Sequence, residues 1–286
     1  MEFTPKYVIT EQLLANIKKI SAITAELNHR QFPNPVIFEL ERAAREVSSF
    51  ASTSIEGNPL PLTEVKKILK SAPRNARQSE QEVLNYNRAL EALNKKLRSG
   101  TLPLSLDLIL SIQALVMDKL LPPYQTGKFR TEPVVVNDPR AKKIVYLPPD
   151  VKEVGPLMES LVAFSGEQKG LIDPLILAGI FHKQFVIIHP FMDGNGRTAR
   201  LATKVLLAEM GLNTFNLFSF ENYYNKNVTG YFKNVGVYGN YYELVSRVDF
   251  TSWLEYFSEG IIDELLRVQK TLITASINPN SELLSH

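Results

Sequence analysis

Residues 173–211 constrain the fold of this chain more than any other stretch of its sequence. Asp173-Pro174 is typical of a helix start, because an N-cap residue is followed by proline at the first helical position. The apolar run that follows must end at His189, since Pro190 disfavours a helical conformation in the residue before it. After a short glycine-containing turn, apolar residues return at helical spacing until a final glycine. The stretch is therefore expected to form two helices joined by a tight loop.

The loop between these two helices concentrates residues suited to phosphate and metal binding. His189 is the side-chain type whose ordinary pKa lies near neutrality, so it can accept a proton from an attacking hydroxyl. Asp193 offers a hard oxygen ligand for Mg²⁺. Gly194 and Gly196 allow the backbone N–H groups to approach a ligand closely, and Asn195 can add a side-chain donor. Together these residues predict a cradle for an anion.

Two arginines follow the glycine turn. Arg197 and Arg200 are three residues apart, so they occupy neighbouring positions on a helix surface, and their planar guanidinium groups suit phosphate oxygens. An ordinary helix-capping loop would explain the glycines. It would not explain why a histidine, an aspartate and both arginines coincide. The segment is expected to handle a metal-bound polyphosphate.

The stretch 189–200 resembles the signature of Fic-domain proteins, His-Pro-Phe-x-Asp/Glu-Gly-Asn-Gly-Arg-x-x-Arg, and every fixed position of that signature is present. Fic proteins mostly transfer AMP from ATP to a protein hydroxyl and release pyrophosphate. The resemblance implies a mainly α fold, a Fic-type helical bundle with a small β-hairpin flap over the active site. Related toxin kinases carry a lysine at the position of Gly196 and bind ATP in the reverse sense, so Gly196 favours AMP transfer.

The resemblance also implies roles for individual residues. His189 would be the general base, Asp193 the Mg²⁺ ligand, and the target a Tyr, Ser or Thr hydroxyl. ATP, the substrate, would be bound by Gly194, Asn195, Gly196, Arg197, Thr198, Ala199 and Arg200. Tyr231 is a candidate for stacking on the adenine base, although a core tyrosine explains it equally well.

A second motif lies far upstream, in the sequence SerThrSerIleGluGly that begins at Ser52. It resembles the inhibitory motif of the same family, Ser/Thr-x-x-x-Glu-Gly/Asn. Ser52 and Glu56 would share one face of a helix that Gly57 ends. The resemblance implies that Glu56 pairs with Arg200, so that ATP cannot place its terminal phosphate productively. Taken alone, an ordinary helix end with a glycine explains so short a pattern.

Two β-rich runs are expected to form the flap. Residues 127–131 with 134–136 form the first run, 144–149 form the second, and a polar turn at 137–140 separates them. In Fic proteins the flap holds the target segment by backbone pairing. Ile144, Val145 and Tyr146 would then face the target, whereas a hairpin that only covers the core is the alternative.

Composition narrows the classes of protein that remain. With 286 residues and 44% hydrophobic content, the chain can bury a sizeable core. The formal net charge is only +2 and the basic residues are dispersed, so no nucleic-acid or membrane partner is expected. The absence of cysteine excludes disulfides, cysteine nucleophiles and thiolate metal sites. Neither a signal pattern nor an apolar run of membrane-spanning length is present, and a cytoplasmic location is expected.

Apolar spacing predicts the remaining helices at 10–27, 36–54, 63–70, 78–97, 106–121, 151–165, 222–234 and 249–275. The expected organisation is an N-terminal helical arm at 1–71 that carries the inhibitory helix, a catalytic core with C-terminal helices at 72–275, and a frayed tail at 276–286.

Three functions are compatible with these motifs. The first is an autoinhibited, Mg²⁺-dependent protein adenylyltransferase, a nucleotidyltransferase that acts on a target protein or on itself. In the second, Glu56 orients water to remove AMP from a modified protein. The third is a noncatalytic, nucleotide-sensing interaction module. A homodimer is compatible with each of them.

Overall fold

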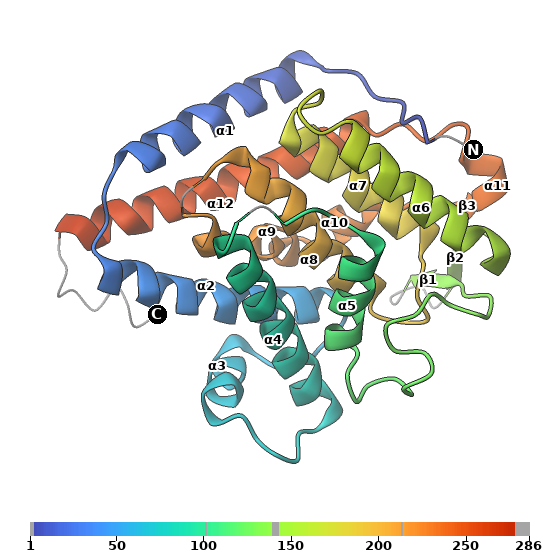
Figure 1. Cartoon of the computed structure of the whole chain (residues 1–286), viewed down its shortest axis with the longest axis horizontal. Coiled ribbons are helices and arrows are strands. Elements are labelled where there is room, and N and C mark those ends of the chain that lie inside the picture. The colour runs from blue at the N-terminus through green and yellow to red at the C-terminus, as the bar shows by residue number, and fades with distance from the viewer. Residues whose placement is uncertain (1–2, 101, 139–142, 213, 278–286) are drawn as a thin grey trace.

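The computed structural model describes residues 3–100, 102–138, 143–212 and 214–277, and Figure 1 shows its course. The described chain is mainly helical, as predicted, with a sheet of short strands at one side. The first helix, α1 (Glu11–His29), lies along the last, α12 (Thr251–Ile277), and the two are drawn in blue and red in Figure 1. Segments from opposite ends of the sequence therefore pack side by side.

The remaining helices are α2 (Asn34–Ile55), α3 (Leu62–Ser71), α4 (Gln78–Arg98), α5 (Leu106–Val116), α6 (Val151–Glu167), α7 (Pro174–Ile188), α8 (Asn195–Leu207), α9 (Phe220–Lys226), α10 (Val228–Val235) and α11 (Tyr241–Leu244). Short 3₁₀ turns follow at Ala208–Met210 and Phe215–Leu217. The helix expected at 222–234 is in fact two helices. Asn227 leaves the helical region, and its side chain caps α10 by accepting a hydrogen bond from the Gly230 N–H.

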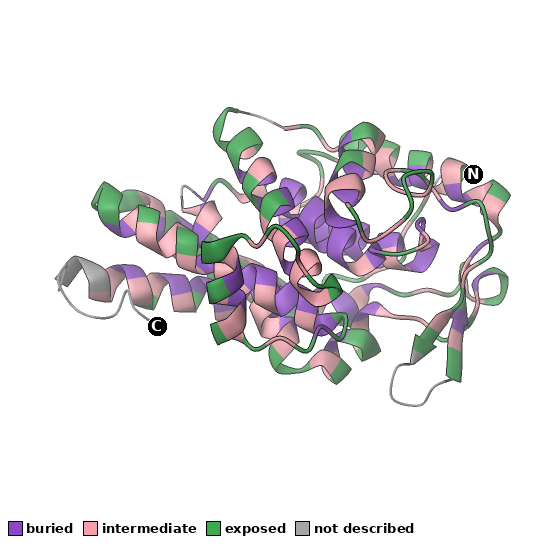
Figure 2. Ribbon diagram, turned by 90° about the horizontal axis from the view of Figure 1, so that it is seen from below, coloured by how far each residue is buried: buried purple, intermediate pink, exposed green. Residues whose placement is uncertain are grey.

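Helix α7 forms the centre of the core. Nearly all of its side chains are buried, which is the property of a helix surrounded by others on every side. Figure 2 shows the buried residues gathered in the middle of the molecule. At Gly179, an added Cβ would lie 2.6 Å from Leu254 Cδ2, so this glycine permits α7 and α12 to approach closely. Trp253 of α12 donates to the Gly179 carbonyl at 2.7 Å across the same contact.

The first two helices contribute to the same core. Leu13, Ile20, Ile23 and Leu27 of α1 belong to one apolar cluster with side chains of α7, α8 and α12. Helix α2 packs against α4 and α9, which places its C-terminal end beside the start of α8. The domain boundary expected at residue 71 stays a prediction.

The predicted hairpin is confirmed. Strand β1 (Val136–Asp138) pairs antiparallel with β2 (Lys143–Leu147). Residues 137 and 138, expected in the turn, belong to β1, residues 134 and 135 precede it, and the other expected turn residues lie outside the described ranges. The run at 127–131 forms no strand. An unexpected strand, β3 (Gly239–Asn240), pairs parallel with β2 at Tyr146 and Leu147. Most of the expected frayed tail, from residue 278, also lies outside the described chain.

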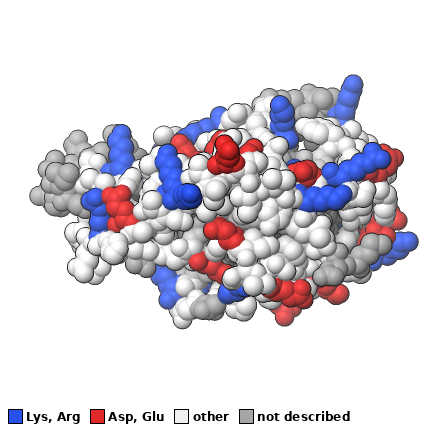
Figure 3. All heavy atoms as spheres, turned by 90° about the horizontal axis from the view of Figure 1, so that it is seen from above, with Lys and Arg blue, Asp and Glu red and all other residues white. Residues whose placement is uncertain are grey.

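The described surface agrees with the near-neutral charge of the sequence. On the face shown in Figure 3, basic and acidic side chains alternate without a large patch of either sign. None of the helices in the described ranges combines the length and the apolar character that crossing a membrane requires.

Candidate active site

His189 ends helix α7 in an unusual backbone conformation. It has φ 52° and ψ 61°, in the left-handed region, and its N–H donates to the Phe185 carbonyl at 3.0 Å. For a residue with a Cβ, this conformation costs roughly 1–2 kcal/mol. The ring Nδ1 lies 3.4 Å from the Val186 carbonyl, and a proton on Nδ1 leaves the Nε2 lone pair available. Burial lowers the pKa of His189 to about 4, so the neutral, proton-accepting ring predominates at pH 7.

The glycine turn that follows is held rigidly by its neighbours. Gly194 has φ 81°, and an added Cβ would lie 2.7 Å from Met117 Sδ, so only glycine fits without a shift. Gln113 donates to the Asp193 carbonyl at 3.3 Å and accepts from the Gly127 N–H. The Asn195 side chain makes two 2.9 Å hydrogen bonds with the Phe191 backbone. Asn195, expected to donate toward the nucleotide, therefore closes the loop instead in this structure.

The first two turns of α8 carry buried polar atoms that have no hydrogen-bond partner within the described ranges. Arg197 donates from Nη2 to Asp193 Oδ1 at 3.2 Å, but its Nε and Nη1 atoms have no hydrogen-bond partner among the described residues. The same holds for Arg200 Nη1 and Thr198 Oγ1. Buried polar groups are rarely left unpaired, and a helix N-terminus attracts negative charge. This combination fits an anionic ligand at the start of α8.

Glu56, at the end of α2, occupies part of this anion site. Its Oε1 lies 2.8 Å from Arg200 Nη2, and Arg200 is fully buried while the Glu56 side chain is 30% exposed. An added Cβ on Gly196 would lie 2.1 Å from the same oxygen, so the carboxylate rests directly on the glycine turn. Ser52 accepts from Arg200 Nε through Oγ and from Nη2 through its carbonyl, each at 2.8 Å. Ser52 and Glu56 thus hold the Arg200 side chain from α2.

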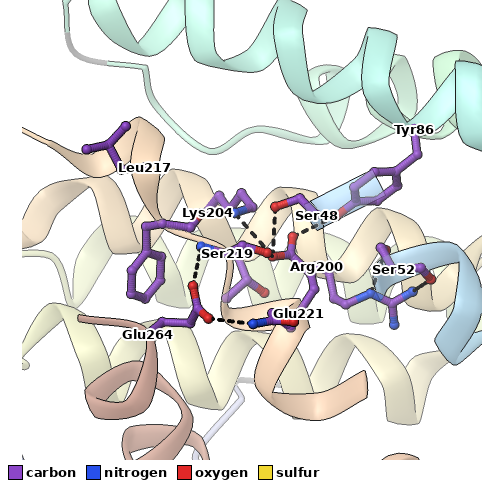
Figure 4. Close-up of polar contacts among 12 residues, drawn as sticks. Ser48, Ser52, Tyr86, Arg200, Lys204, Leu217, Ser219, Glu221 and Glu264 are labelled. Atoms are coloured by element: carbon purple, nitrogen blue, oxygen red, sulfur yellow. Dashed lines mark hydrogen bonds and ion pairs between the residues drawn. The ribbon is translucent and has the colours of Figure 1, made fainter. Parts of the chain in front are cut away.

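Behind Arg200, a buried polar network continues into the core (Figure 4). Tyr86 donates to Glu221 Oε1 at 2.7 Å, and Ser48 donates to Oε2 of the same carboxylate at 3.4 Å. Lys204 lies 3.4 Å from Glu221 Oε2, and Ser219 donates to that oxygen at 3.2 Å. Burial raises the pKa of the Tyr86 hydroxyl, so it remains a donor. Polar side chains of α2, α4 and α8 therefore converge on the fully buried Glu221 carboxylate.

Tyr231 lies close to Arg200 but not on an open surface. Its ring is buried and stacks on Tyr224 with centroids 4.8 Å apart. Its hydroxyl lies 2.9 Å from His182 Nε2. In this structure Tyr231 is part of an aromatic cluster in the core, and its contact with adenine stays a prediction.

The flap residues divide by exposure. Ile144 is 59% exposed, which suits contact with another chain. Tyr146 is buried, and its hydroxyl donates to the Ile187 carbonyl at the end of α7 with a distance of 2.9 Å. Val145 is partly buried against a small apolar cluster formed by Tyr146, Ile187 and Tyr241. Tyr146 thus ties the flap to the helix that carries His189.

Sequence reasoning missed three residues that shape this site: Gln113, Arg130 and Tyr86. Gln113 is a buried amide on the otherwise apolar helix α5, and that contrast was a usable signal. Arg130 donates from Nε to the His189 carbonyl at 2.9 Å. The segment 82–86 weakly resembles a helix of the Fic family, but nothing in it indicates that Tyr86 has a partner on α9.

Asp193 fits the expected metal. Its side chain is 58% exposed at the mouth of the loop. The described residues contain no cluster of three or more acidic or histidine side chains that could enclose an ion. Mg²⁺ commonly takes only one or two carboxylates and completes its shell with substrate phosphates and water. A single exposed aspartate beside an anion site meets that requirement.

Comparison with known proteins agrees with the geometry of this site. Residues 103–207 match the model of the Fic/DOC family, and the chain therefore carries a Fic domain. It is 30% identical to protein adenylyltransferase fic-1 of Caenorhabditis elegans over 203 residues. This alignment covers 68% of this chain and 38% of that protein. With protein adenylyltransferase Fic of Nematostella vectensis it shares 29% identity over 182 residues, 60% of this chain and 40% of that protein. The chain thus spans about 40% of the length of these relatives.

Solved structures share the fold. A Fic family protein from Desulfovibrio desulfuricans superposes with a TM-score of 0.76 at 24% identity, covering 94% of this chain and 77% of that one. Fic-1 from C. elegans gives a TM-score of 0.69 at 22% identity, covering 92% of this chain and 73% of that one.

Proposed function

We propose that this chain is a protein adenylyltransferase that Glu56 holds in an inhibited state. The observation that carries the proposal is the ion pair between Glu56 of the upstream motif and Arg200 of the loop motif. Glu56 Oε1 and Arg200 Nη2 lie 2.8 Å apart inside the anion site. Relatives at about 30% identity are named protein adenylyltransferases, and they support the same reaction class. ATP and a protein hydroxyl are the proposed substrates.

The proposed chemistry uses the residues of the loop in sequence. His189 Nε2 takes the proton of the target hydroxyl, whose oxygen forms a bond to the α-phosphorus of ATP. The bond from that phosphorus to the oxygen bridging to the β-phosphate breaks, and pyrophosphate leaves. Arg197, Arg200 and the N–H groups of the glycine turn neutralise the phosphate charge. Asp193 would hold Mg²⁺, which supplies further charge neutralisation when bound.

Inhibition follows from competition for one guanidinium. While Glu56 occupies Arg200, a phosphate oxygen must displace the carboxylate before it can bind there. A hydrogen bond between charged groups contributes about 1.5–3 kcal/mol. Removing the Glu56 carboxylate should therefore raise the rate of AMP transfer by roughly 10- to 100-fold.

The test is labelling with ATP that carries the label on its α-phosphate, in the presence of Mg²⁺. Wild type, Glu56→Gly and His189→Ala are compared, with the chain alone to detect self-modification and with a cell lysate to detect other targets. Glu167→Gly, which removes an exposed glutamate at the end of α6, is the matched control and should behave as wild type. Equal label in Glu56→Gly and His189→Ala would reject the proposal.

A second candidate is the reverse function, removal of AMP by a water molecule that Glu56 orients. The exposure of the Glu56 carboxylate on the glycine turn favours it, because the carboxylate is accessible to solvent next to the phosphate site. Protein modified by Glu56→Gly can be repurified and incubated with wild type. Release of AMP by wild type but not by Glu56→Gly would support removal, and tight ATP binding without either reaction would indicate a noncatalytic sensor.

A further inference from the structure

Arg130 is a buried arginine without a carboxylate partner. Its residue is only 3% exposed, and it forms no ion pair within the described ranges. Burying a guanidinium is costly unless its donors are satisfied. Burial lowers the pKa of Arg130 from its usual value, yet at pH 7 an arginine stays charged. The negative charge of Asp150 acts on Arg130 from beyond ion-pair distance, and the direct hydrogen-bond acceptors of the guanidinium are polar groups of the backbone.

Those groups are three carbonyls from separate parts of the site. Arg130 Nε donates to the His189 carbonyl at 2.9 Å, Nη1 to the Glu132 carbonyl at 3.4 Å, and Nη2 to the Pro149 carbonyl. The Arg130 N–H also donates to the Pro190 carbonyl at 2.9 Å. One residue thus contacts both members of the His189-Pro190 pair.

The other two acceptors, the Glu132 and Pro149 carbonyls, lie at the two ends of the flap. Glu132 precedes β1 and Pro149 follows β2, so the guanidinium bridges the two arms of the flap at their base. The third acceptor belongs to the residue that carries the proposed general base, in its strained left-handed conformation. A planar fork with donors in fixed directions can join three carbonyls, whereas a lysine ammonium cannot span them.

We propose that Arg130 is a positioning residue, which fixes the flap and the backbone of His189 in one relative arrangement. The inference rests on the proposed AMP transfer in one respect only: a target hydroxyl held by the flap must arrive at His189. Misplacement by about 1 Å can cost roughly 100-fold in rate. Arg130 therefore acts on transfer and not on ATP binding, since none of its contacts reaches Arg197 or Arg200.

The first experiment measures transfer and binding separately. In the Glu56→Gly background, Arg130→Lys should lower kcat for label incorporation by at least about tenfold and change KM for ATP less than about twofold. Arg42→Lys, an exposed arginine of α2, is the matched control and should change neither. Full activity of Arg130→Lys, or a parallel loss of ATP affinity, would overturn the proposal.

The second experiment needs no activity, so it separates this inference from the proposed function. Amide hydrogen exchange is measured on otherwise wild-type chains that carry Arg130→Lys or Arg130→Gln. We expect faster exchange, by about tenfold or more, at 132–138 and 143–149, and unchanged exchange in α12. Should Arg130→Gln fail to fold, Arg130→Lys decides the question. Unchanged exchange in the flap, or equally faster exchange throughout the chain, would refute a positioning role even if the chain transfers AMP.

Discussion

Two histidines, His182 in the core and the partly buried His189, are expected to make stability depend on pH. His182 lies between Thr203 Oγ1 at 3.0 Å and Tyr231 at 2.9 Å, and its ring is fully buried. Burial, and then the positive charge of Arg200, lower the pKa of His182 to about 3. An unfolded histidine has a pKa of 6.5, so the unfolded state takes up protons that the folded state refuses. Stability is then complete above pH 6.5 and falls as the pH drops toward the folded value.

We predict that His182 alone removes about 2 kcal/mol of stability between about pH 7 and pH 5. His189, with a pKa near 4, adds a penalty in the same direction. Urea unfolding at the two pH values checks the prediction. His182→Gln is expected to be less stable at pH 7 but to lose less on acidification. An identical loss in wild type and His182→Gln would show that the ring is not buried as described.

The glycine turn supplies a second prediction at the scale of one residue. Gly194→Ala meets both a positive φ and Met117 Sδ at 2.7 Å, so it should destabilise the chain by about 2–4 kcal/mol. Gly211→Ala is the control, because Gly211 has φ 73° but no atom within 4 Å of an added Cβ. It should cost only about 1 kcal/mol. Thermal unfolding followed by circular dichroism measures both, and equal shifts would contradict the role of the Met117 contact.

At the scale of elements, α2 docks on the site through side chains spaced by four residues. Ser48, Ser52 and Glu56 share one face, and they meet Glu221 Oε2 at 3.4 Å and Arg200 at 2.8 Å. The sequence predicted Ser52 and Glu56, because a short motif carries both. It could not predict Ser48, Tyr86 or Glu221. Their contacts depend on how α2, α4 and α9 pack, and no local pattern encodes that packing.

The same contrast holds for the elements themselves. Helix α7, which has an N-cap and a long apolar run, was predicted to within a residue or two, whereas the helix expected at 106–121 ends at Val116. The split between α9 and α10 was missed because Asn227 can cap a helix or continue it, and the choice depends on the surrounding packing. Strand β3 is too short to leave a pattern and exists only because β2 lies beside it.

The network beneath α2 leads to a prediction about Tyr86. Tyr86→Phe removes the donor to Glu221 Oε1 and leaves a buried carboxylate short of one hydrogen bond, so it should cost about 1–3 kcal/mol. Tyr224→Phe is a matched control, since the Tyr224 hydroxyl is also fully buried but has no hydrogen-bond partner among the described residues. It should be neutral or slightly stabilising. Equal destabilisation by both substitutions in urea unfolding would argue against the network.

At the scale of the whole molecule, the question is whether the N-terminal arm unfolds separately from the catalytic core. Leu13, Ile20 and Leu27 of α1 are buried in the cluster that also contains Trp253 of α12. Polar contacts also join the start of α1 to α12, since Thr10 donates to Glu255 and Gln12 donates to Glu259. Elements that share one core are expected to unfold together.

Ile20→Ala, in the first helix, is therefore predicted to destabilise the entire chain by about 2–5 kcal/mol. Trp253, the single tryptophan, reports on the contact between α7 and α12, whereas circular dichroism reports on all helices. Both signals should shift to the same lower denaturant midpoint. Leu14→Ala, at a position that is 45% exposed on the same helix, should shift them much less. The contrary result is an unchanged Trp253 midpoint together with an earlier loss of part of the circular dichroism signal. It would show that the arm unfolds on its own, because the burial of α1 would then stabilise only the arm.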